Sequence, residues 1–245
     1  MHILVTRPEA DAVALKLPLE AMGHQVSHAP MIEISFADAD PVDVRSCCAL
    51  IATSRNGLRG LERQLATLTP DTFKLPVYAV GPGSAAAAKA LGFSRVIEGP
   101  ASAAGLVPLV TRDLQPSDGA LVHLAGDKLA FDFHAALGPL GFELRQPVVY
   151  RSVPAAGLPE GVAQDLARGQ IDAVVLMSPQ TAQTFVNVTT SAGLASAARQ
   201  LAFVCLSDAV LKQLDAWQPV RAEAARSPNL EETVGAVKRL TQQFR

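Results

Sequence analysis

Six segments of the chain follow apolar runs and precede helical patterns, and their residues are small, hydroxyl-bearing or charged. They are Thr6-Arg7-Pro8, Thr53-Ser54-Arg55-Asn56-Gly57, Gly81-Pro82-Gly83-Ser84, Gly126-Asp127-Lys128, Ser178-Pro179-Gln180 and Ser207-Asp208. Backbone N–H groups at the start of a helix attract anions, so such segments could bind an anionic ligand. Serine, threonine, aspartate and glycine also cap helices at these positions. The segments therefore indicate helix caps, and their clustering at one sheet edge predicts an anion site.

One segment has the spacing of a dinucleotide-binding turn. Gly81-x-Gly83-x-x-Ala86 lies between a predicted strand and a predicted helix, and Glu98 follows 17 residues after Gly81. In nicotinamide enzymes such glycines approach the pyrophosphate and such an acidic residue binds the ribose. Pro82 removes one N–H donor from the turn, and no companion residues for hydride transfer are evident. A nicotinamide-dependent oxidoreductase is kept as an alternative.

Cysteine and histidine patterns predict neither a disulfide nor a metal centre. Cys47, Cys48 and Cys205 form no C-x-x-C pair and lie in or beside apolar stretches, so we interpret them as core residues. His24 and His28 are four residues apart, but the residues between them alternate as in a strand. In a strand that spacing does not create a shared helical face, so we expect no metal site there.

The composition excludes several classes of protein. Lys plus Arg is 21 and Asp plus Glu is 23, which gives a net charge of -2, and 49% of the residues are hydrophobic. Such a chain is globular and lacks the basic excess of a nucleic-acid or anionic-membrane surface. No apolar run approaches the roughly 20 residues that span a bilayer, and the first residues lack a signal-peptide pattern. We expect a cytoplasmic protein that binds neither nucleic acid nor membrane.

Strand and helix patterns alternate along the chain, which is typical of parallel sheets in an α/β fold. The predicted strands cover residues 3–6, 25–34, 49–53, 77–80, 95–98, 120–124, 144–150, 172–177, 202–206 and 220–222. The predicted helices cover residues 8–22, 58–68, 84–91, 131–140, 163–168, 180–189, 209–217 and 230–243. Pro18 predicts a kink or break in the first helix, and Gly23 predicts its end.

This pattern is duplicated within the chain. Residues 3–5 and 23–26 match residues 121–123 and 141–144, both at an offset of 118 residues. Residues 49–54 match 173–178 at an offset of 124, and residues 76–81 match 202–207 at an offset of 126. The ordered matches predict two similar lobes with a ligand cleft between them, and parallel sheets bind ligands at the carboxyl ends of their strands. A non-catalytic two-lobed binding protein is a second alternative.

In their order and spacing, these segments resemble the uroporphyrinogen-III synthase family. The resemblance covers most of the chain and rests on Val5-Thr6-Arg7-Pro8, Thr53-Ser54-Arg55-Asn56-Gly57, Ala79-Val80-Gly81-Pro82-Gly83-Ser84-Ala85, Val149-Tyr150-Arg151 and Ser178-Pro179. One departure is Cys205-Leu206-Ser207-Asp208-Ala209-Val210, which replaces a second glycine-threonine loop of the family and lacks its threonine hydroxyls.

The resemblance implies two similar α/β lobes, each a parallel sheet flanked by helices, joined by a two-stranded connector. The first lobe is expected to be discontinuous, over residues 1–35 plus 152–245, and the second to cover residues 39–148. The connectors are expected near residues 31–38 and 146–152.

The resemblance also implies a lyase of haem biosynthesis. Such an enzyme closes hydroxymethylbilane, a linear tetrapyrrole, to uroporphyrinogen III, with loss of water and inversion of ring D through a spiro intermediate. We therefore expect a monomer that uses no cofactor or metal and whose partner is this small-molecule substrate.

The strand ends and the resemblance together give the expected site residues. Tyr150 is the expected proton donor to the departing hydroxyl, as the tyrosine of the family's Val-Tyr motif, because the other tyrosine, Tyr78, lies in a strand expected to face the core. Alternatively, Tyr150 only braces the connector. The expected substrate-binding residues are Arg7, Thr53, Ser54, Arg55, Asn56, Gly81, Gly83, Ser84, Gly126, Lys128, Arg151, Ser178, Pro179, Gln180 and Ser207.

Overall fold

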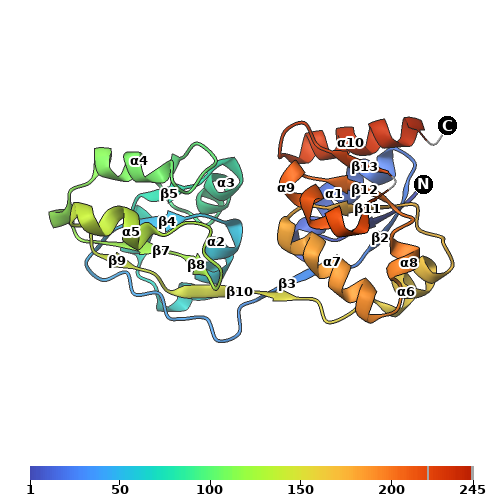
Figure 1. The fold of residues 1–245 in the computed structure, drawn as a ribbon. Helices are drawn as coiled ribbons and strands as arrows, with labels where there is room; N and C mark the ends of the chain where they lie inside the picture. The colour runs from blue at the N-terminus through green and yellow to red at the C-terminus, as the bar shows by residue number, and fades with distance from the viewer. Residues whose placement is uncertain (220, 244–245) are drawn as a thin grey trace. The chain divides into compact units, whose positions relative to one another are not determined.

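The chain folds into two compact units, which we call unit 1 (Met1–Glu33 with Val153–Arg245) and unit 2 (Ile34–Ser152). The computed structural model describes residues 1–219 and 221–243, so the first residue of the strand predicted at 220–222 lies outside the described residues. Each unit has a parallel sheet flanked by helices, as Figure 1 shows, and the predicted α/β class with two similar lobes is confirmed.

Unit 1 is a five-stranded sheet between two helical layers. All its strand pairs are parallel, and the strands lie in the order β13 (Ala222–Ala224), β12 (Ala202–Cys205), β11 (Ala173–Leu176), β1 (His2–Val5) and β2 (Gln25–His28). Its helices are α1 (Glu9–Ala21), α6 (Glu160–Ala167), α7 (Pro179–Ser191), α8 (Ala195–Ala198), α9 (Asp208–Leu211), a 3₁₀ helix (Lys212–Trp217) and α10 (Leu230–Gln243).

Successive residues of a strand point to opposite faces of the sheet, and helices bury both faces here. Leu4 packs with Phe185 of α7 in one core, whereas Ile3 packs with Leu15 and Leu19 of α1 in the other. Burying a leucine or isoleucine side chain stabilises a fold by about 1.5–3 kcal/mol. Burial on two sides explains why the strands read as continuous apolar runs in the sequence.

Unit 2 repeats this architecture. Its strands lie in the order β6 (Val96–Glu98), β5 (Val77–Ala79), β4 (Cys47–Ala52), β7 (Ala120–His123) and β9 (Leu144–Arg145), again all parallel. Helices α2 (Arg55–Glu62) and α3 (Pro82–Ala90) cover one face, and α4 (Leu106–Asp113) and α5 (Phe133–Leu137) cover the other. Short 3₁₀ helices lie at Leu65–Thr67, Pro70–Lys74, Pro116–Asp118 and Gly138–Leu140.

The duplicated segments of the sequence occupy equivalent strands in the two sheets. The matches pair β1 with β7, β2 with β9, β11 with β4 and β12 with β5, and each pair has the same position in its sheet order. The remaining edge strands, β13 and β6, then also correspond. The internal duplication is therefore a duplication of topology.

Two strands pass from one unit to the other, as the connector prediction requires. They are β3 (Ile32–Ser35) and β10 (Val148–Pro154), which form a three-stranded sheet with β8 (Ala125–Gly126) in the order β3-β10-β8. The Met31 carbonyl accepts from the Ala155 N–H and the Val148 carbonyl accepts from the Asp40 N–H, both at 2.9 Å. The two connecting segments therefore run in opposite directions.

Some predicted elements differ from the structure. Helix α1 continues through Pro18, so the predicted break is wrong; Pro18 lies in the last turn, and Gly23 follows at a φ of 82°. Helix α4 was not predicted, and it contains Pro108 in its first turn, where proline is tolerated. The predicted helix 58–68 begins earlier, at Arg55, because Ser54 caps it.

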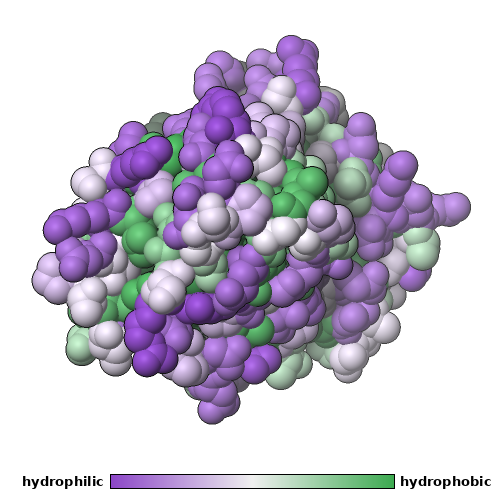
Figure 2. All heavy atoms as spheres, turned by 90° about the vertical axis from the view of Figure 1, so that its left-hand side faces the viewer, coloured by the Kyte–Doolittle hydropathy of each residue, from purple (hydrophilic) through white to green (hydrophobic). Residues whose placement is uncertain are grey.

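The surface of unit 2 mixes polar and apolar side chains. On the side shown in Figure 2, hydrophobic residues lie between hydrophilic ones rather than in one continuous area. Large exposed hydrophobic side chains in this unit are Leu65, Leu129 and Leu140. Over residues 1–219 and 221–243, no helix has the length and apolar character needed to span a membrane.

Candidate functional site

A pocket with both hydroxyl-bearing and apolar lining residues lies within unit 2, where β4 and β7 end and β8 and β10 pair. Its volume is about 330 Å³. Its lining residues are Thr53, Ser54, Val80, Ala101, Ala103, His123, Gly126, Lys128, Leu129, Ala130, Phe131, Phe133 and Tyr150. Five predicted site residues, Thr53, Ser54, Gly126, Lys128 and Tyr150, are thus brought together by the fold.

Ser54 connects the start of α2 to the tyrosine of β10. Its Oγ accepts a hydrogen bond from the Gly57 N–H at 3.1 Å, which caps the helix, and donates to the Tyr150 hydroxyl at 3.0 Å. With Ser54 as the donor, the hydrogen of the Tyr150 hydroxyl is not used in this bond. Ser54 therefore caps α2 and also lines the pocket.

The Tyr150 ring is held against the backbone of β8. The Asp127 N–H donates to the Tyr150 carbonyl at 3.1 Å, and the Ser152 N–H donates to the Asp127 carboxylate at 2.9 Å. A Cβ atom on Gly126 would lie 2.5 Å from Cζ of the Tyr150 ring. Any side chain at position 126 would overlap the Tyr150 ring, so the observed position of the ring requires glycine there.

Helix α2 approaches the strands closely because two of its residues are glycines. A Cβ atom on Gly57 would lie 2.5 Å from the Leu124 carbonyl oxygen, and one on Gly60 would lie 2.5 Å from the Val149 carbonyl oxygen. The close approach brings the cap residue Ser54 within hydrogen-bond reach of β10. The two glycines are three residues apart in the GLRG sequence of α2, but the sequence alone does not say which strands they contact.

His123 and Gln146 were missed by the sequence analysis as site residues. His123 is only 2% exposed; its Nε2 lies 3.1 Å from Thr53 Oγ1 and its Nδ1 lies 3.0 Å from Gln146 Oε1. Burial lowers the pKa of His123, and the hydrogen bond with Gln146 opposes this shift. The imidazole is therefore neutral at neutral pH. A histidine interrupting the apolar run of β7 is the one signal that could have indicated a buried polar role.

Phe131, Phe133 and Leu129 form the apolar wall, and they were also missed. The His123 and Phe133 rings meet edge to face at a centroid distance of 4.9 Å, as do Phe131 and Phe133. Leu129 is 49% exposed although it lines the pocket. These side chains form the larger apolar part of the pocket lining.

The other predicted residues of unit 2 lie outside the pocket lining. Arg55 and Asn56 begin α2; Asn56 accepts from Arg59 at 2.8 Å. Gly81 is the N-cap residue of α3 and has no side chain that could cap the helix, and Pro82, Gly83 and Ser84 form the first turn. Arg151 is exposed on β10. Since β4 and β5 are adjacent and parallel, α2 and α3 begin at the same sheet edge.

The predicted residues of unit 1 lie at the carboxyl edge of its own sheet. Arg7 follows β1 and pairs with Asp11 at 3.9 Å. Ser178 caps α7 by accepting from the Thr181 N–H at 3.1 Å, with Pro179 and Gln180 in the first turn. Ser207 precedes α9, but its side chain makes no capping hydrogen bond.

The interpretation as a core residue is confirmed for Cys205, whereas Cys47 and Cys48 are half-buried beside the core of unit 2. Cys205 is buried, and burial raises the pKa of its thiol to about 12. Burial likewise raises the pKa of Cys47 to about 11. Burial also raises the pKa of Cys48, which packs against the hydrophobic core between the unit 2 sheet and helices α4 and α5. Thiols of this kind stay protonated and are poor nucleophiles.

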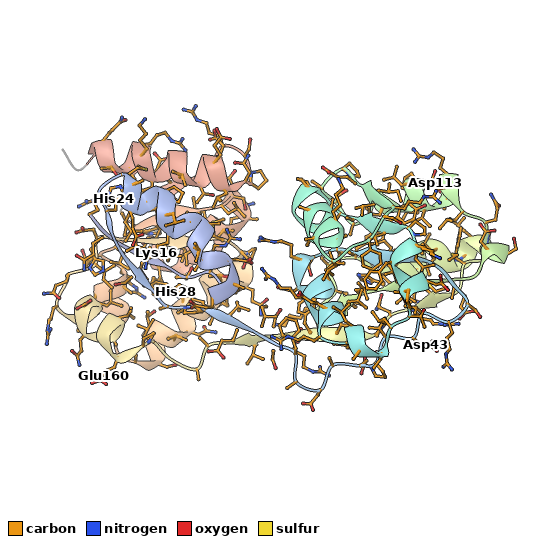
Figure 3. All side chains as sticks on the ribbon, turned by 180° about the vertical axis from the view of Figure 1, so that it is seen from behind. Lys16, His24, His28, Asp43, Asp113 and Glu160 are labelled. Atoms are coloured by element: carbon orange, nitrogen blue, oxygen red, sulfur yellow. The ribbon has the colours of Figure 1, made fainter. Side chains whose placement is uncertain are left out.

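Tyr78 faces the core, as expected. Its ring is buried and its hydroxyl donates to Asp113, which Figure 3 labels, at 3.3 Å. Burial and the negative charge of Asp113 raise the pKa of Tyr78 to about 12. The pocket therefore contains one of the two tyrosines, Tyr150.

Of the two histidines that are four residues apart, His24 immediately precedes β2 and His28 is its last residue (Figure 3). At about 3.3 Å per residue, four residues of strand separate them by about 13 Å. His28 instead contacts the Arg7 carbonyl at 2.8 Å and Glu9 at 3.0 Å. Over the part of the chain that the structure describes, no three histidine, cysteine or acidic residues form a group that could hold a metal ion.

Comparisons with known proteins give one consistent family. A family model described as uroporphyrinogen-III synthase HemD matches residues 13–234. The fold is similar to uroporphyrinogen-III synthetase from Helicobacter pylori, with a TM-score of 0.64 at 15% identity, covering 100% of this chain and 99% of that chain. It is also similar to a mutant uroporphyrinogen III synthase from Thermus thermophilus, with a TM-score of 0.57 at 19% identity and 99% of both chains covered. No curated protein matches the sequence. The binding-protein and nicotinamide alternatives gain no support from these matches.

Proposed function

The chain belongs to the uroporphyrinogen-III synthase family, and from this membership we propose how its residues carry out the reaction. The family comprises lyases of tetrapyrrole biosynthesis, so this chain closes hydroxymethylbilane to uroporphyrinogen III with loss of water and inversion of ring D. The chemistry requires a proton donor for the leaving hydroxyl, groups that bind carboxylates, and a shape that favours the spiro route over direct closure.

Tyr150 is the proton donor in this proposal. The observation that carries it is the Ser54–Tyr150 hydrogen bond at the pocket wall, in which Ser54 donates at 3.0 Å and leaves the phenol hydrogen for a ligand. The C–O bond of the hydroxymethyl group breaks, the oxygen keeps the electron pair and takes the phenol proton, and water leaves. The pyrrole nitrogen supplies electrons to the exocyclic carbon, which gives an azafulvene cation. The proton that ring D later releases restores the phenol.

Basic side chains and helix starts bind the substrate carboxylates. In unit 2 these are Lys128 at the pocket, Arg55 and Asn56 at the start of α2, Gly81, Gly83 and Ser84 at the start of α3, and Arg151 on β10. In unit 1 we propose Arg7, Ser178, Pro179, Gln180 and Ser207. Backbone N–H groups at these helix starts attract anions without requiring a high net charge.

We propose further that the chain acts as a monomer in the cytoplasm. Hydroxymethylbilane closes by itself to the type I isomer, so the enzyme must share a compartment with the enzyme that supplies it. We also propose that the lobes expected at residues 1–35 plus 152–245 and at 39–148 act as separate domains. Light scattering after size exclusion tests the monomer, and limited proteolysis tests the domains.

The experiment for Tyr150 is the substitution Tyr150→Phe, which keeps the ring and removes the proton. A positioned acid contributes about 10²–10⁴-fold, and because this substrate ionises readily we expect kcat to fall by about 10²-fold or less with KM unchanged. Tyr78→Phe is the matched control, since that hydroxyl faces the core, and it should leave kcat unchanged. An unaltered kcat for Tyr150→Phe, with type III product still dominant, would reduce Tyr150 to a brace for the connector.

A further inference from the structure

We propose that the unit 2 pocket binds the terminal pyrrole that carries the hydroxymethyl group, and that His123 is a positioning residue that fixes the Thr53 hydroxyl as the acceptor for the N–H of this ring. The inference rests on the proposed function and adds a substrate orientation to it. It starts from two hydroxyl groups on adjacent residues of the chain, Thr53 and Ser54, and from the different partners that these hydroxyls have.

The hydrogen-bond chain at Thr53 determines the direction of its hydroxyl. Gln146 Oε1 carries no hydrogen, so the His123 Nδ1 that lies 3.0 Å away must donate to it. A neutral imidazole has a single N–H, so His123 Nε2 is an acceptor, and Thr53 donates to it across 3.1 Å. The Thr53 oxygen therefore presents only lone pairs to the pocket.

Burial keeps His123 in the neutral form that this argument requires. The ring is 2% exposed and packs against Phe133, and its pKa is lowered by burial. Donating to the imidazole also polarises the Thr53 hydroxyl and makes its oxygen a better acceptor, because hydrogen bonds in a chain strengthen one another.

The Tyr150 hydroxyl has the opposite role and acts as a hydrogen-bond donor toward the pocket. It accepts from Ser54 and keeps its own hydrogen for the pocket. The pocket thus offers an acceptor at Thr53 and a donor at Tyr150. The hydroxymethyl end of the substrate offers the complement, since its ring N–H is a donor and the hydroxyl on the neighbouring carbon is an acceptor.

The size and walls of the pocket suit one ring. Its volume of about 330 Å³ is at the lower end of the range of about 300–1,000 Å³ for ligand pockets, too small for four linked pyrroles. The half-buried Phe131 offers aromatic surface to a ring that becomes cationic, and Lys128 can pair with one of its carboxylates.

The Thr53 contact should act mainly on the rate. When the hydroxyl leaves, positive charge develops on the pyrrole nitrogen and its N–H becomes a stronger donor. A hydrogen bond that is stronger in the transition state than in the ground state raises kcat rather than lowering KM. Removing the acceptor, or freeing the hydroxyl to rotate, should therefore lower kcat and leave KM nearly constant.

A double-mutant cycle on the full chain tests this inference with hydroxymethylbilane as substrate. Thr53→Val should lower kcat about tenfold or more with KM nearly unchanged, and Thr53→Ser should restore most of it. His123→Phe should lower kcat by a similar factor in the wild-type background and cause no further loss in the Thr53→Val background, because His123 acts through Thr53. His134→Phe, at the exposed histidine of α5, is the matched control and should change nothing.

Other outcomes are equally informative. Independent, multiplicative losses in the cycle, or an unchanged kcat for Thr53→Val, would overturn the inference. If His123→Phe does not fold, Gln146→Leu removes the acceptor for Nδ1 and should reproduce the same pattern; a normal kcat in that variant would also overturn it. Failure of the inference is separate from failure of the proposed function, because a wild-type chain that makes only the type I isomer refutes the function itself.

Discussion

Substituting Gly126 by alanine should disable the site while leaving the fold nearly intact. The added Cβ would lie 2.5 Å from Cζ and 2.8 Å from the hydroxyl oxygen of Tyr150. Carbon atoms pack at about 3.5–4.0 Å, so the ring must move by about 1 Å or more. The Ser54–Tyr150 hydrogen bond, 3.0 Å long, does not survive a movement of that size.

The catalytic cost follows from the misplacement. A displacement of about 1 Å can cost about 10²-fold in rate, so kcat of Gly126→Ala should fall toward that of Tyr150→Phe. The stability cost should lie at the low end of the range of about 1–3 kcal/mol for overpacking, because the obstructing group is a side chain that can move. For a chain of this size that is a decrease in Tm of a few degrees, about 2–4 °C.

Gly138→Ala is the control for Gly126→Ala. Gly138 has a helical φ of -57°, and nothing lies within 4 Å of its added Cβ. The control should keep both kcat and Tm, with kcat measured from the consumption of freshly prepared hydroxymethylbilane and Tm by circular dichroism. A Gly126→Ala chain with wild-type kcat and dominant type III product would refute the assigned position of the Tyr150 ring.

Three further predictions concern the packing of α2, the buried histidines and the absence of a cofactor. Gly60→Ala should destabilise the chain by about 1–3 kcal/mol in urea denaturation, because its Cβ would meet the Val149 backbone oxygen, which cannot swing away; an unchanged urea midpoint would contradict the close packing of α2. The free energy of unfolding should fall as the pH drops below about 6.5, because burial lowers the pKa values of His24 and His123 and the unfolded chain therefore takes up protons first. The substitution His24→Asn should make this pH dependence weaker. A pH-independent urea midpoint between pH 7 and 5 would argue against buried neutral imidazoles. Exhaustive chelation and dialysis should leave kcat unchanged, and recovery of a lost activity on adding zinc or NAD would contradict a metal- and cofactor-free site.

The positions of most strands along the chain were predictable because burial on both sheet faces leaves a strong signal. The matches between residues 3–5 and 121–123, and between 49–54 and 173–178, predicted that β1 corresponds to β7 and that β4 corresponds to β11. Cap residues were readable at Ser54 and Ser178, which both cap helices, but not at Ser207, whose side chain makes no capping hydrogen bond. Helix α4 was missed because Pro108 hides a short helical pattern that tertiary packing supports.

The pocket was only half predictable. Thr53, Ser54 and Tyr150 belong to motifs at strand ends, whereas His123, Gln146 and Phe133 stand in sequence contexts that look structural. His123 reaches the site because the register of β4 with β7 sets Ile51 opposite His123 and so brings Thr53 beside the imidazole. The meaning of Gly57 and Gly60 likewise depends on which carbonyl oxygens they face.

The isomer composition of the product tests the central claim most directly. Freshly prepared hydroxymethylbilane is incubated with the wild-type chain and, in parallel, without it; the products are oxidised to porphyrins and the isomers are separated by chromatography. We predict mainly the type III isomer with the chain present and the type I isomer without it. Type I alone in both samples, formed at equal rates, would contradict the assignment of this chain as a uroporphyrinogen-III synthase.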